Sequence, residues 1–380
     1  MIYCKECLEP NTRPGSSWDS SDICTACEYH KSIKEIYWPD RREILLNIVD
    51  EAKKDNKKSQ YDCIVGVSGG KDSTRQALYI RDNLGLNPLL VCMSYPPSQV
   101  TDLGSSNLSN LIRLGFDLEI IGPSPILWKK LIKEAFFKFS NWGKATEMAL
   151  FSAVPIIAIN YDIPLVIWGE NPGLQIGDFG MIGKNGWDGN NMKSGNTLAG
   201  GDISWMEEMG ISEKDLIFFR YPIEKEFEAK NINIIYLGWF IGDWNFITNG
   251  RTSLSYGLSP RLDPATETGD ASNVSSLDED WVIFNQMIKY YKFGFGKTTE
   301  YVNEQIRVGS MSRDEAIKLV EQYDGKCADK YIDSFCDYIN ITKKEFWEVI
   351  DKNVNKKLFT STGEEGKYVP NFKVGLGLHD

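Results

Sequence analysis

Apolar runs of strand length recur along the chain and are separated by segments with helical spacing. The runs cover residues 61–67, 87–95, 116–122 and 163–169. Each run is short and rich in apolar residues, as expected of a buried strand. Strands of this kind that alternate with helices predict an α/β fold with a parallel sheet and right-handed crossovers.

The most apolar stretch, residues 149–168, is long enough to span a membrane. It contains two prolines together with Asn160 and Asp162, which would place polar groups in hydrocarbon. We therefore expect a buried helix followed by a strand, and no membrane span. The N-terminus "MIYCKECLEP" has no basic segment before an apolar run, so we expect no secretion signal and a cytoplasmic location.

Two polar stretches interrupt the apolar pattern. Residues 169–201 contain ten glycines and no periodic apolar positions, so we expect no core element there. Their aromatic, Asn and Asp residues suit a substrate loop for a polyhydroxylated ligand, and passive disorder is the alternative. The second stretch, residues 259–280, predicts a linker or a lid.

The C-terminal part is predicted to be helical from its capping signals. Ser312 with Glu315, and Thr342 with Glu345, fit the capping box. Ahead of them, Lys297 lies in a glycine-rich turn that opens a helix, where a cation could reach a phosphate. A solvated surface lysine is an equally good interpretation.

The net charge of -11 argues against a protein that holds nucleic acid through many basic contacts, since such binding depends on Lys and Arg at the phosphates. We therefore expect no nucleic-acid partner. A local basic groove stays compatible with this charge.

Four of the eight cysteines fall in the first 27 residues, with zinc-ribbon spacing. They are Cys4, Cys7, Cys24 and Cys27. In a reducing compartment such pairs indicate a metal rather than disulfides, and the polar loop between them cannot form a core without one. Four thiolates predict a closed structural Zn²⁺ site, with His30 as a nearby partner or substitute ligand.

The loop "SGGKDS" follows the first predicted strand and opens a helix that Gly85 closes. A helix N-terminus attracts an anion, and Gly69 and Gly70 let the backbone approach it closely. Ser68 and Ser73 add hydroxyl donors, and Lys71 adds a charge. This is not a Walker A loop, which would need Gly at position 65 and Ser or Thr at position 72.

Residues at the carboxyl ends of the parallel strands should face the ligand cleft. On this argument we expect Met93, Glu170 and Asn171 to contact a nucleotide. For Glu170 and Asn171, a solvated loop start is an equally good interpretation.

The string Ser68–Ser73 resembles the pyrophosphate loop of the PP-loop ATP pyrophosphatases, whose fold is the Rossmann-like adenine nucleotide alpha-hydrolase type. Together with "YCKECLEPNTRPG", "WGENP" and residues 291–325, it makes the chain resemble the N-acetyl sugar amidotransferase family. Members of that family convert an acetamido group into an acetamidino group during synthesis of lipopolysaccharide O-chains and nonulosonic acids.

The resemblance implies ATP and Mg²⁺ as cofactors and an N-acetylated sugar, nucleotide-activated or nonulosonic, as substrate. It also implies catalytic roles for Lys71, Asp72 and Lys297. Asp72 could position Mg²⁺ or cap the helix. Three regions follow: a zinc ribbon at 1–35, a PP-loop domain at 36–250, and a linker or lid with helices at 251–380.

The source of ammonia is expected to be another protein. A glutaminase needs a Cys-His pair or a cysteine directly after the initiator Met, whereas this chain has only His30 and His379 and carries Ile2. The resemblance likewise implies a separate glutaminase subunit as partner.

Two alternatives stay open. Zinc-ribbon PP-loop enzymes include tRNA thiolases, but this chain is acidic and has no cysteine between Cys92 and Cys327 for sulfur chemistry or an iron-sulfur cluster. Cys63 and Cys92 lie in predicted strands and fit small core residues. The other alternative is a non-catalytic assembly protein that binds nucleotide.

Overall fold

A parallel five-stranded sheet forms the centre of the computed structural model, which describes residues 1–16, 18, 20–56, 59–195 and 198–378. The strand order is β3-β2-β1-β4-β5, and every neighbouring pair is parallel. The strands are β1 (Cys63–Gly66), β2 (Pro88–Met93), β3 (Asp117–Ile121), β4 (Leu165–Trp168) and β5 (Asn233–Tyr236). The first four fall on the predicted runs. The sequence analysis missed β5.

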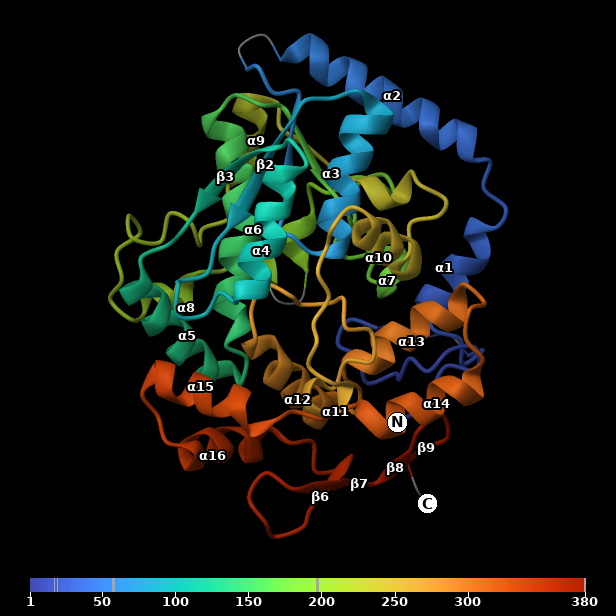
Figure 1. Cartoon of the computed structure of the whole chain (residues 1–380), viewed down its shortest axis with the longest axis vertical. Coiled ribbons are helices and arrows are strands. Elements are labelled where there is room, and N and C mark those ends of the chain that lie inside the picture. The colour runs from blue at the N-terminus through green and yellow to red at the C-terminus, as the bar shows by residue number, and fades with distance from the viewer. Residues whose placement is uncertain (17, 19, 57–58, 196–197, 379–380) are drawn as a thin grey trace.

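Helices cover both faces of this sheet (Figure 1). Alternate strand residues such as Ile64 and Val166 pack with α5 (Pro125–Phe139) and α6 (Gly143–Asn160). Their neighbours, such as Val65 and Ile167, face α2 (Trp38–Asp55), α3 (Lys71–Leu84) and α4 (Asp102–Arg113). Strands β1, β2 and β4 are buried on both faces, which is why their runs are apolar without alternation, whereas the edge strand β3 carries Asp117 and Glu119 and is partly exposed. The predicted α/β class is confirmed.

A helical layer follows the sheet region and lies at the bottom of Figure 1. It comprises α12 (Trp281–Phe293), α13 (Lys297–Arg307), α14 (Arg313–Tyr323), α15 (Asp329–Ile339) and α16 (Lys343–Asn353). Both predicted capping boxes are confirmed, at the starts of α14 and α16. The chain ends in two small antiparallel pairs, β6 (Phe359–Ser361) with β7 (Tyr368–Pro370) and β8 (Phe372–Lys373) with β9 (Gly377–Leu378).

Aromatic side chains join this layer to the sheet region. Phe136 of α5 stacks on Phe346 of α16 with ring centroids 5.2 Å apart, and Phe284 of α12 lies 4.6 Å from Phe335 of α15. All four rings belong to the hydrophobic cluster that also contains one face of the sheet. The division at residues 35/36 and 250/251 stays a prediction.

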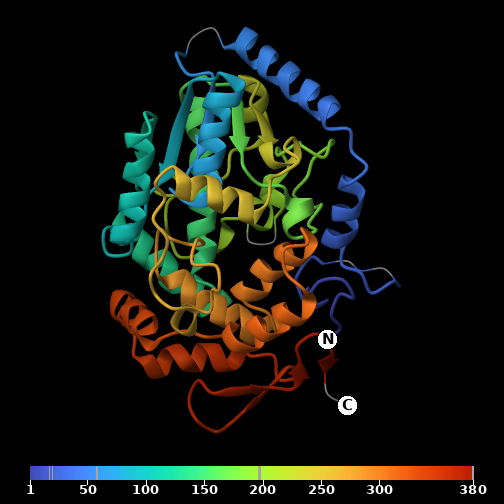
Figure 2. The same cartoon turned by 45° about the vertical axis from the view of Figure 1, so that its right-hand side comes forward.

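The N-terminal ribbon lies beside α13 and next to the C-terminal strands (Figure 2). It continues into α1 (Thr25–Ile33), which packs on α7 (Pro172–Gln175). Four further helices connect these parts: α8 (Ser204–Glu207), α9 (Glu224–Lys230), α10 (Phe246–Ser255) and α11 (Ala265–Thr268). Within the described ranges, no helix has the length and apolar character needed to cross a membrane.

The glycine-rich segment 169–201 differs from expectation. Besides α7 it contains two short 3-10 turns, Met192–Ser194 and Ala199–Gly201. Met192 and Leu198 are buried in the main hydrophobic cluster. Isolated apolar residues in an irregular segment leave no periodic signal, so the pattern concealed this contribution to the core.

Segment 259–280 packs directly against α4. The Thr101 backbone N–H donates to the Asp278 carbonyl at 3.1 Å, and the Asn107 side chain pairs with the Ser259 backbone. The contact is so close at Gly104 that an added Cβ would lie 2.5 Å from the Asp278 Cα. This glycine is therefore required for the segment to lie where it does.

Gly104→Ala is expected to destabilise the protein by about 1–3 kcal/mol, because the new methyl group overlaps the Asp278 backbone. An alanine in a helix normally stabilises by about 0.5–1 kcal/mol relative to glycine. A loss of stability in Gly104→Ala would therefore identify the overlap with the Asp278 backbone as its cause. Urea unfolding measures the change, with Ser106→Ala on the exposed face of the same helix as control. An unchanged or raised stability of Gly104→Ala would contradict the packing described.

Candidate functional site

A cavity of about 320 Å³ opens at the carboxyl ends of β1 and β4. The strand order reverses between these two strands, which is where open α/β sheets bind ligands. One part of the lining is apolar and consists of Gly66, Val91, Met93, Leu150, Phe151, Val154 and Trp168. The other part carries polar groups: Ser68, Gly70, Lys71, Asp72, Ser73, Glu170, Asp278 and Lys297.

The "SGGKDS" loop runs from β1 into α3, as predicted. Gly69 has φ +79, and a Cβ there would lie 2.8 Å from the Leu108 backbone nitrogen of α4. Both the left-handed conformation and the close approach require glycine at this position. Gly70 is the N-cap residue, so the first N–H groups of α3 have no partner within the helix and suit an anion. The Ser73 hydroxyl donates to the Gly70 carbonyl at 3.2 Å.

Helix α10 holds the start of α3 in place. The Ser253 hydroxyl donates to the Lys71 carbonyl at 2.6 Å, and the Asn249 amide donates to Asp72 at 2.6 Å. Asn249 in turn accepts from Arg75, which also pairs with Asp243 at 2.6 Å. This chain of contacts leaves little freedom to the side chains at the head of α3.

Lys71 and Asp72 form an ion pair at the polar end of the cavity, with Nζ and Oδ2 2.5 Å apart. The Lys71 ammonium also lies 4.1 Å from the centre of the Phe246 ring. Burial acts to raise the pKa of Asp72, but the charge of Lys71 and the amide of Asn249 outweigh it and lower that pKa. Asp72 is therefore an anion in the cavity rather than the N-cap of α3, a position that Gly70 occupies.

Glu170 lines the same cavity as this pair. Burial raises the pKa of Glu170 to about 7, and the nearby Asp72 charge adds to the effect. Its Oε2 atom is buried and has no hydrogen-bond partner among the described residues. Two carboxylates that line one cavity, one of them with an unsatisfied oxygen, fit a divalent cation such as Mg²⁺.

Lys297, the first residue of α13, reaches the same cavity. Burial acts to lower the pKa of its ammonium, but the Glu300 carboxylate outweighs this and raises the pKa. Lys297 therefore adds a second fixed positive charge near the loop. From the sequence, a solvated surface lysine is an equally good interpretation. In the structure, the Lys297 side chain lines the cavity.

Two other predicted residues have different surroundings. Met93 lines the apolar part of the cavity. Asn171 does not line it: this buried side chain caps α7 by accepting from Leu174 N–H and donates to the Gly238 carbonyl. Asn171 thus shapes the turn after β4, and a nucleotide contact for it stays a prediction.

The cavity also includes residues that sequence reasoning missed. Val274, Ser275, Ser276 and Asp278 come from segment 259–280, so this segment covers the loop in the manner of a lid. Phe151 and Trp168 form a tilted ring pair 5.3 Å apart. No local pattern marked any of them, because only the tertiary fold brings them to β1.

The four predicted metal ligands gather at one point of the ribbon. The Sγ atoms of Cys4, Cys7, Cys24 and Cys27 all lie within 4.8 Å of one another, and all four residues are buried. This donor set fits a closed tetrahedral zinc site. His30 is not in this group and lines a separate cavity with Trp38 and Arg307.

Helix α13 links the ribbon to the cavity. At its carboxyl end, Asn303 accepts from the Leu8 N–H at 2.7 Å and donates to Glu9 at 2.9 Å. The Arg307 guanidinium lies 3.7 Å from the sulfurs of Cys7 and Cys24. At the opposite end of the helix, Lys297 faces the loop.

The parallel sheet with helices on both faces defines a doubly wound α/β protein, with the glycine-rich loop between β1 and α3 and a cavity at the switch point. Residues 269–371 match the family model described as LPS biosynthesis protein WbpG-like, C-terminal domain. The matched residues include α13 and part of the segment that covers the cavity. The match agrees with the resemblance noted from the sequence.

The solved structures that are similar to this chain include two synthetases. One is an NH3-dependent NAD synthetase from Campylobacter jejuni, with 15% identity over 60% of this chain and 100% of that one, and a TM-score of 0.28. The other is an NMN synthetase from Francisella tularensis, with 15% identity over 60% and 99% and the same TM-score. These TM-scores are too low to support a conclusion about this chain. No curated protein matches it.

Glu170→Gln is expected to stabilise the ligand-free protein at about pH 8. A carboxyl group with a raised pKa in the folded state favours folding at low pH, and this advantage is lost between about pH 4.5 and about pH 7. Above that pH window the charged Glu170 lowers the free energy of unfolding by up to about 3 kcal/mol, and the neutral Gln avoids this loss. Urea unfolding at about pH 5 and pH 8 measures this difference, with the exposed Glu207→Gln as control. An equal difference between wild type and Glu170→Gln at both pH values would refute it.

The ribbon is expected to bind about one zinc ion per chain, measurable by elemental analysis. Cys24→Ser should abolish binding and lower the Tm by at least about 5 °C, because binding energy at such a site is folding energy. Cys327→Ser, outside the cluster, should keep the metal. Zinc retained by Cys24→Ser at the wild-type level would show that this cluster is not the site.

Proposed function

We propose that this chain is an ATP-dependent amidotransferase that converts the acetamido group of an N-acetylated sugar into an acetamidino group. The sugar is nucleotide-activated or a nonulosonic acid, and its product serves bacterial surface polysaccharide synthesis. The observation that carries the proposal is the cavity at the switch point, where the N-terminus of α3, two lysines and three carboxylates meet an apolar half. The match of residues 269–371 to an LPS biosynthesis domain supports the biological setting.

The two halves of the cavity suit the two ends of ATP. The apolar half, with Val91, Met93 and Phe151, would take the adenine ring. The backbone at Gly69 and Gly70 and the side chains of Ser68, Lys71 and Ser73 would hold the phosphates. Lys297, which lines the same cavity from the start of α13, would add a second cation to the phosphates.

The reaction needs two displacements. The acetamido carbonyl oxygen attacks the α phosphorus, and the bond to the β phosphate breaks to release pyrophosphate. Ammonia then adds to the imidate carbon, and the C–O bond breaks to give AMP, the acetamidine and a proton. Lys71, Lys297 and the amides at the start of α3 would stabilise the charge that grows on pyrophosphate.

Asp72 and Glu170 line the same cavity and would hold Mg²⁺, which would neutralise charge on the phosphates when bound. The raised pKa of Glu170 implies that a bound cation competes with a proton for this carboxylate. Asp72 is already anionic because of Lys71. Asp72 would thus provide a negative charge that is always present. Glu170 would provide one only when its carboxyl group has lost its proton.

Ammonia would come from a separate glutaminase subunit. His30, the only histidine in the described ranges, lies beside the ribbon and lines a different cavity from the loop. His379 lies outside the described residues. Nothing in this arrangement favours glutamine hydrolysis by the chain itself, so we keep a glutaminase partner as part of the proposal.

The thiolase alternative gains no support from the cavity. Among the residues that the structure describes, no cysteine lines it. Cys63 and Cys92 lie in β1 and β2 and face the hydrophobic cluster on the far side from α6. Burial raises the pKa of Cys92 to about 12, so its thiolate is rare at neutral pH.

The test incubates the purified protein with Mg-ATP, ammonium chloride and a panel of N-acetylated nucleotide sugars and CMP-nonulosonates. We expect AMP and pyrophosphate to form in step with a sugar whose mass falls by the change from O to NH. Pyrophosphate release only with bulk tRNA and a sulfur donor would favour the thiolase instead. The absence of turnover with every sugar would reject the amidotransferase proposal.

Lys71→Ala and Ser73→Ala are expected to lower kcat by roughly 10²–10³-fold for the lysine and less for the serine, because each removes a donor to the leaving group. Circular dichroism and Tm verify folding, and the exposed Lys54→Ala serves as control. Full activity of both variants would contradict the placement of pyrophosphate at this loop. Loss of activity in folded variants would exclude the non-catalytic assembly protein.

A further inference from the structure

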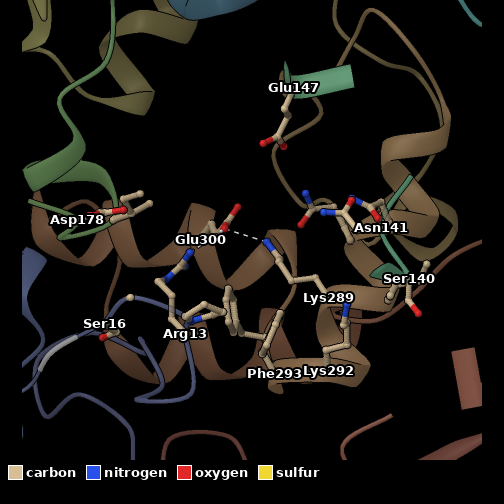
Figure 3. A pocket seen from close by; sticks show the side chains of 17 residues that line it. Arg13, Ser16, Ser140, Asn141, Glu147, Asp178, Lys289, Lys292, Phe293 and Glu300 are labelled. Atoms are coloured by element: carbon tan, nitrogen blue, oxygen red, sulfur yellow. Dashed lines mark hydrogen bonds and ion pairs between the residues drawn. The ribbon is translucent and has the colours of Figure 1, made fainter. Parts of the chain in front are cut away.

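A second cavity, of about 420 Å³, lies between the ribbon, α6, α12 and α13 (Figure 3). Arg13 and Ser16 come from the ribbon loop, Glu147 from α6, and Lys289 and Lys292 from α12. We call it the acceptor cavity. The role proposed for it rests on the proposed function.

The lining of the acceptor cavity suits a polyhydroxylated ligand. It combines three cationic side chains with three carboxylates and several amides and hydroxyls, beside the rings of Phe293 and Phe295. In Figure 3, Arg13, Lys289 and Glu300 converge on one side of the space, and Glu147 points into it from the other. Ile176 and Asp178 reach it from segment 169–201, the stretch predicted to be a substrate loop.

The acceptor cavity is a direct neighbour of the nucleotide cavity. Glu300 accepts from Lys289 of the acceptor cavity at 2.8 Å and from Lys297 of the nucleotide cavity at 3.4 Å. A small cavity of about 20 Å³ shares Gln286 with the first and Lys297 with the second. A group held near Gln286 is thus next to the phosphate end of the nucleotide cavity.

Gln286 has an acceptor that nothing satisfies. Its Oε1 atom is buried and has no hydrogen-bond partner among the described residues. A buried acceptor without a donor is costly, so a ligand that supplies an N–H is favoured there. An acetamido group has one such N–H, and its carbonyl oxygen points in the opposite direction.

We propose that the acceptor cavity binds the N-acetylated sugar and that Gln286 accepts the acetamido N–H, which turns the carbonyl oxygen toward Lys297 and the α phosphate. The sugar hydroxyls contact the charged side chains of α12 and the ribbon loop. Gln286 is a substrate-positioning residue, and the chemical step stays with the nucleotide cavity.

The test compares Gln286→Met with wild type in steady-state kinetics, using the acetamido sugar that gives the highest turnover. Met matches Gln in length but cannot accept the N–H. We expect the KM for the sugar to rise roughly tenfold, from the loss of one buried hydrogen bond, while the KM for ATP stays unchanged. Gln322→Met, on the exposed face of α14, is the matched control.

A binding measurement separates positioning from folding. The O-acetyl analogue of the same sugar lacks the N–H, so its inhibition constant for wild type should be larger than the dissociation constant of the N-acetyl sugar. This gap between the two constants should vanish in Gln286→Met. An unchanged sugar KM with an unchanged gap would overturn the inference. A raised KM for ammonium alone would also overturn it, in favour of an ammonia route. Absence of turnover in wild type would instead reject the proposed function.

Discussion

The attachment of α13 to the N-terminal ribbon controls the geometry of both cavities. Its carboxyl-terminal half is held by Asn303, which accepts from the Leu8 N–H and donates to Glu9, and by Arg307 beside the cysteine sulfurs. Its N-terminal residue, Lys297, faces the phosphate loop. Eleven residues of α-helix span about 16 Å, so a shift at the ribbon is transmitted rigidly to the lysine. The ribbon thereby acts on the site from a distance, since none of its described residues lines the nucleotide cavity.

Buried charges along α13 extend this constraint. Glu300 accepts from Arg13 of the ribbon, Lys289 of α12 and Lys297 itself, and these cations outweigh the effect of burial and lower its pKa. Removing one member of such a network leaves the others uncompensated, which is far more costly than losing a surface ion pair. Glu304 adds a further contact, because its carboxylate accepts a hydrogen bond from the Phe246 N–H at the start of α10. The same helix also holds the N-terminal end of α3 in place. Loop, lysine and ribbon therefore behave as one assembly.

Local signals in the sequence predicted the parts of the site that lie close together along the chain. The strand-loop-helix unit at Ser68–Ser73 and both capping boxes were found because neighbours in sequence create them. The cysteine pairs were recognised by their spacing. Asp278 and Gln286 were missed, since only packing across long sequence separations brings them to the cavities. The position of Asn171 after β4 indicated either a ligand contact or a solvated loop start. Its side chain is buried and caps α7, and a nucleotide contact stays a prediction.

The central claim is that the acetamido oxygen itself attacks ATP in the cavity between β1 and β4. The most direct test uses a sugar substrate labelled with ¹⁸O at the acetamido carbonyl and follows the label by mass spectrometry. We predict that the label appears in AMP and that the acetamidine product carries none. Unlabelled AMP, with the label kept in the sugar or found in inorganic phosphate, would contradict adenylation of the acetamido group.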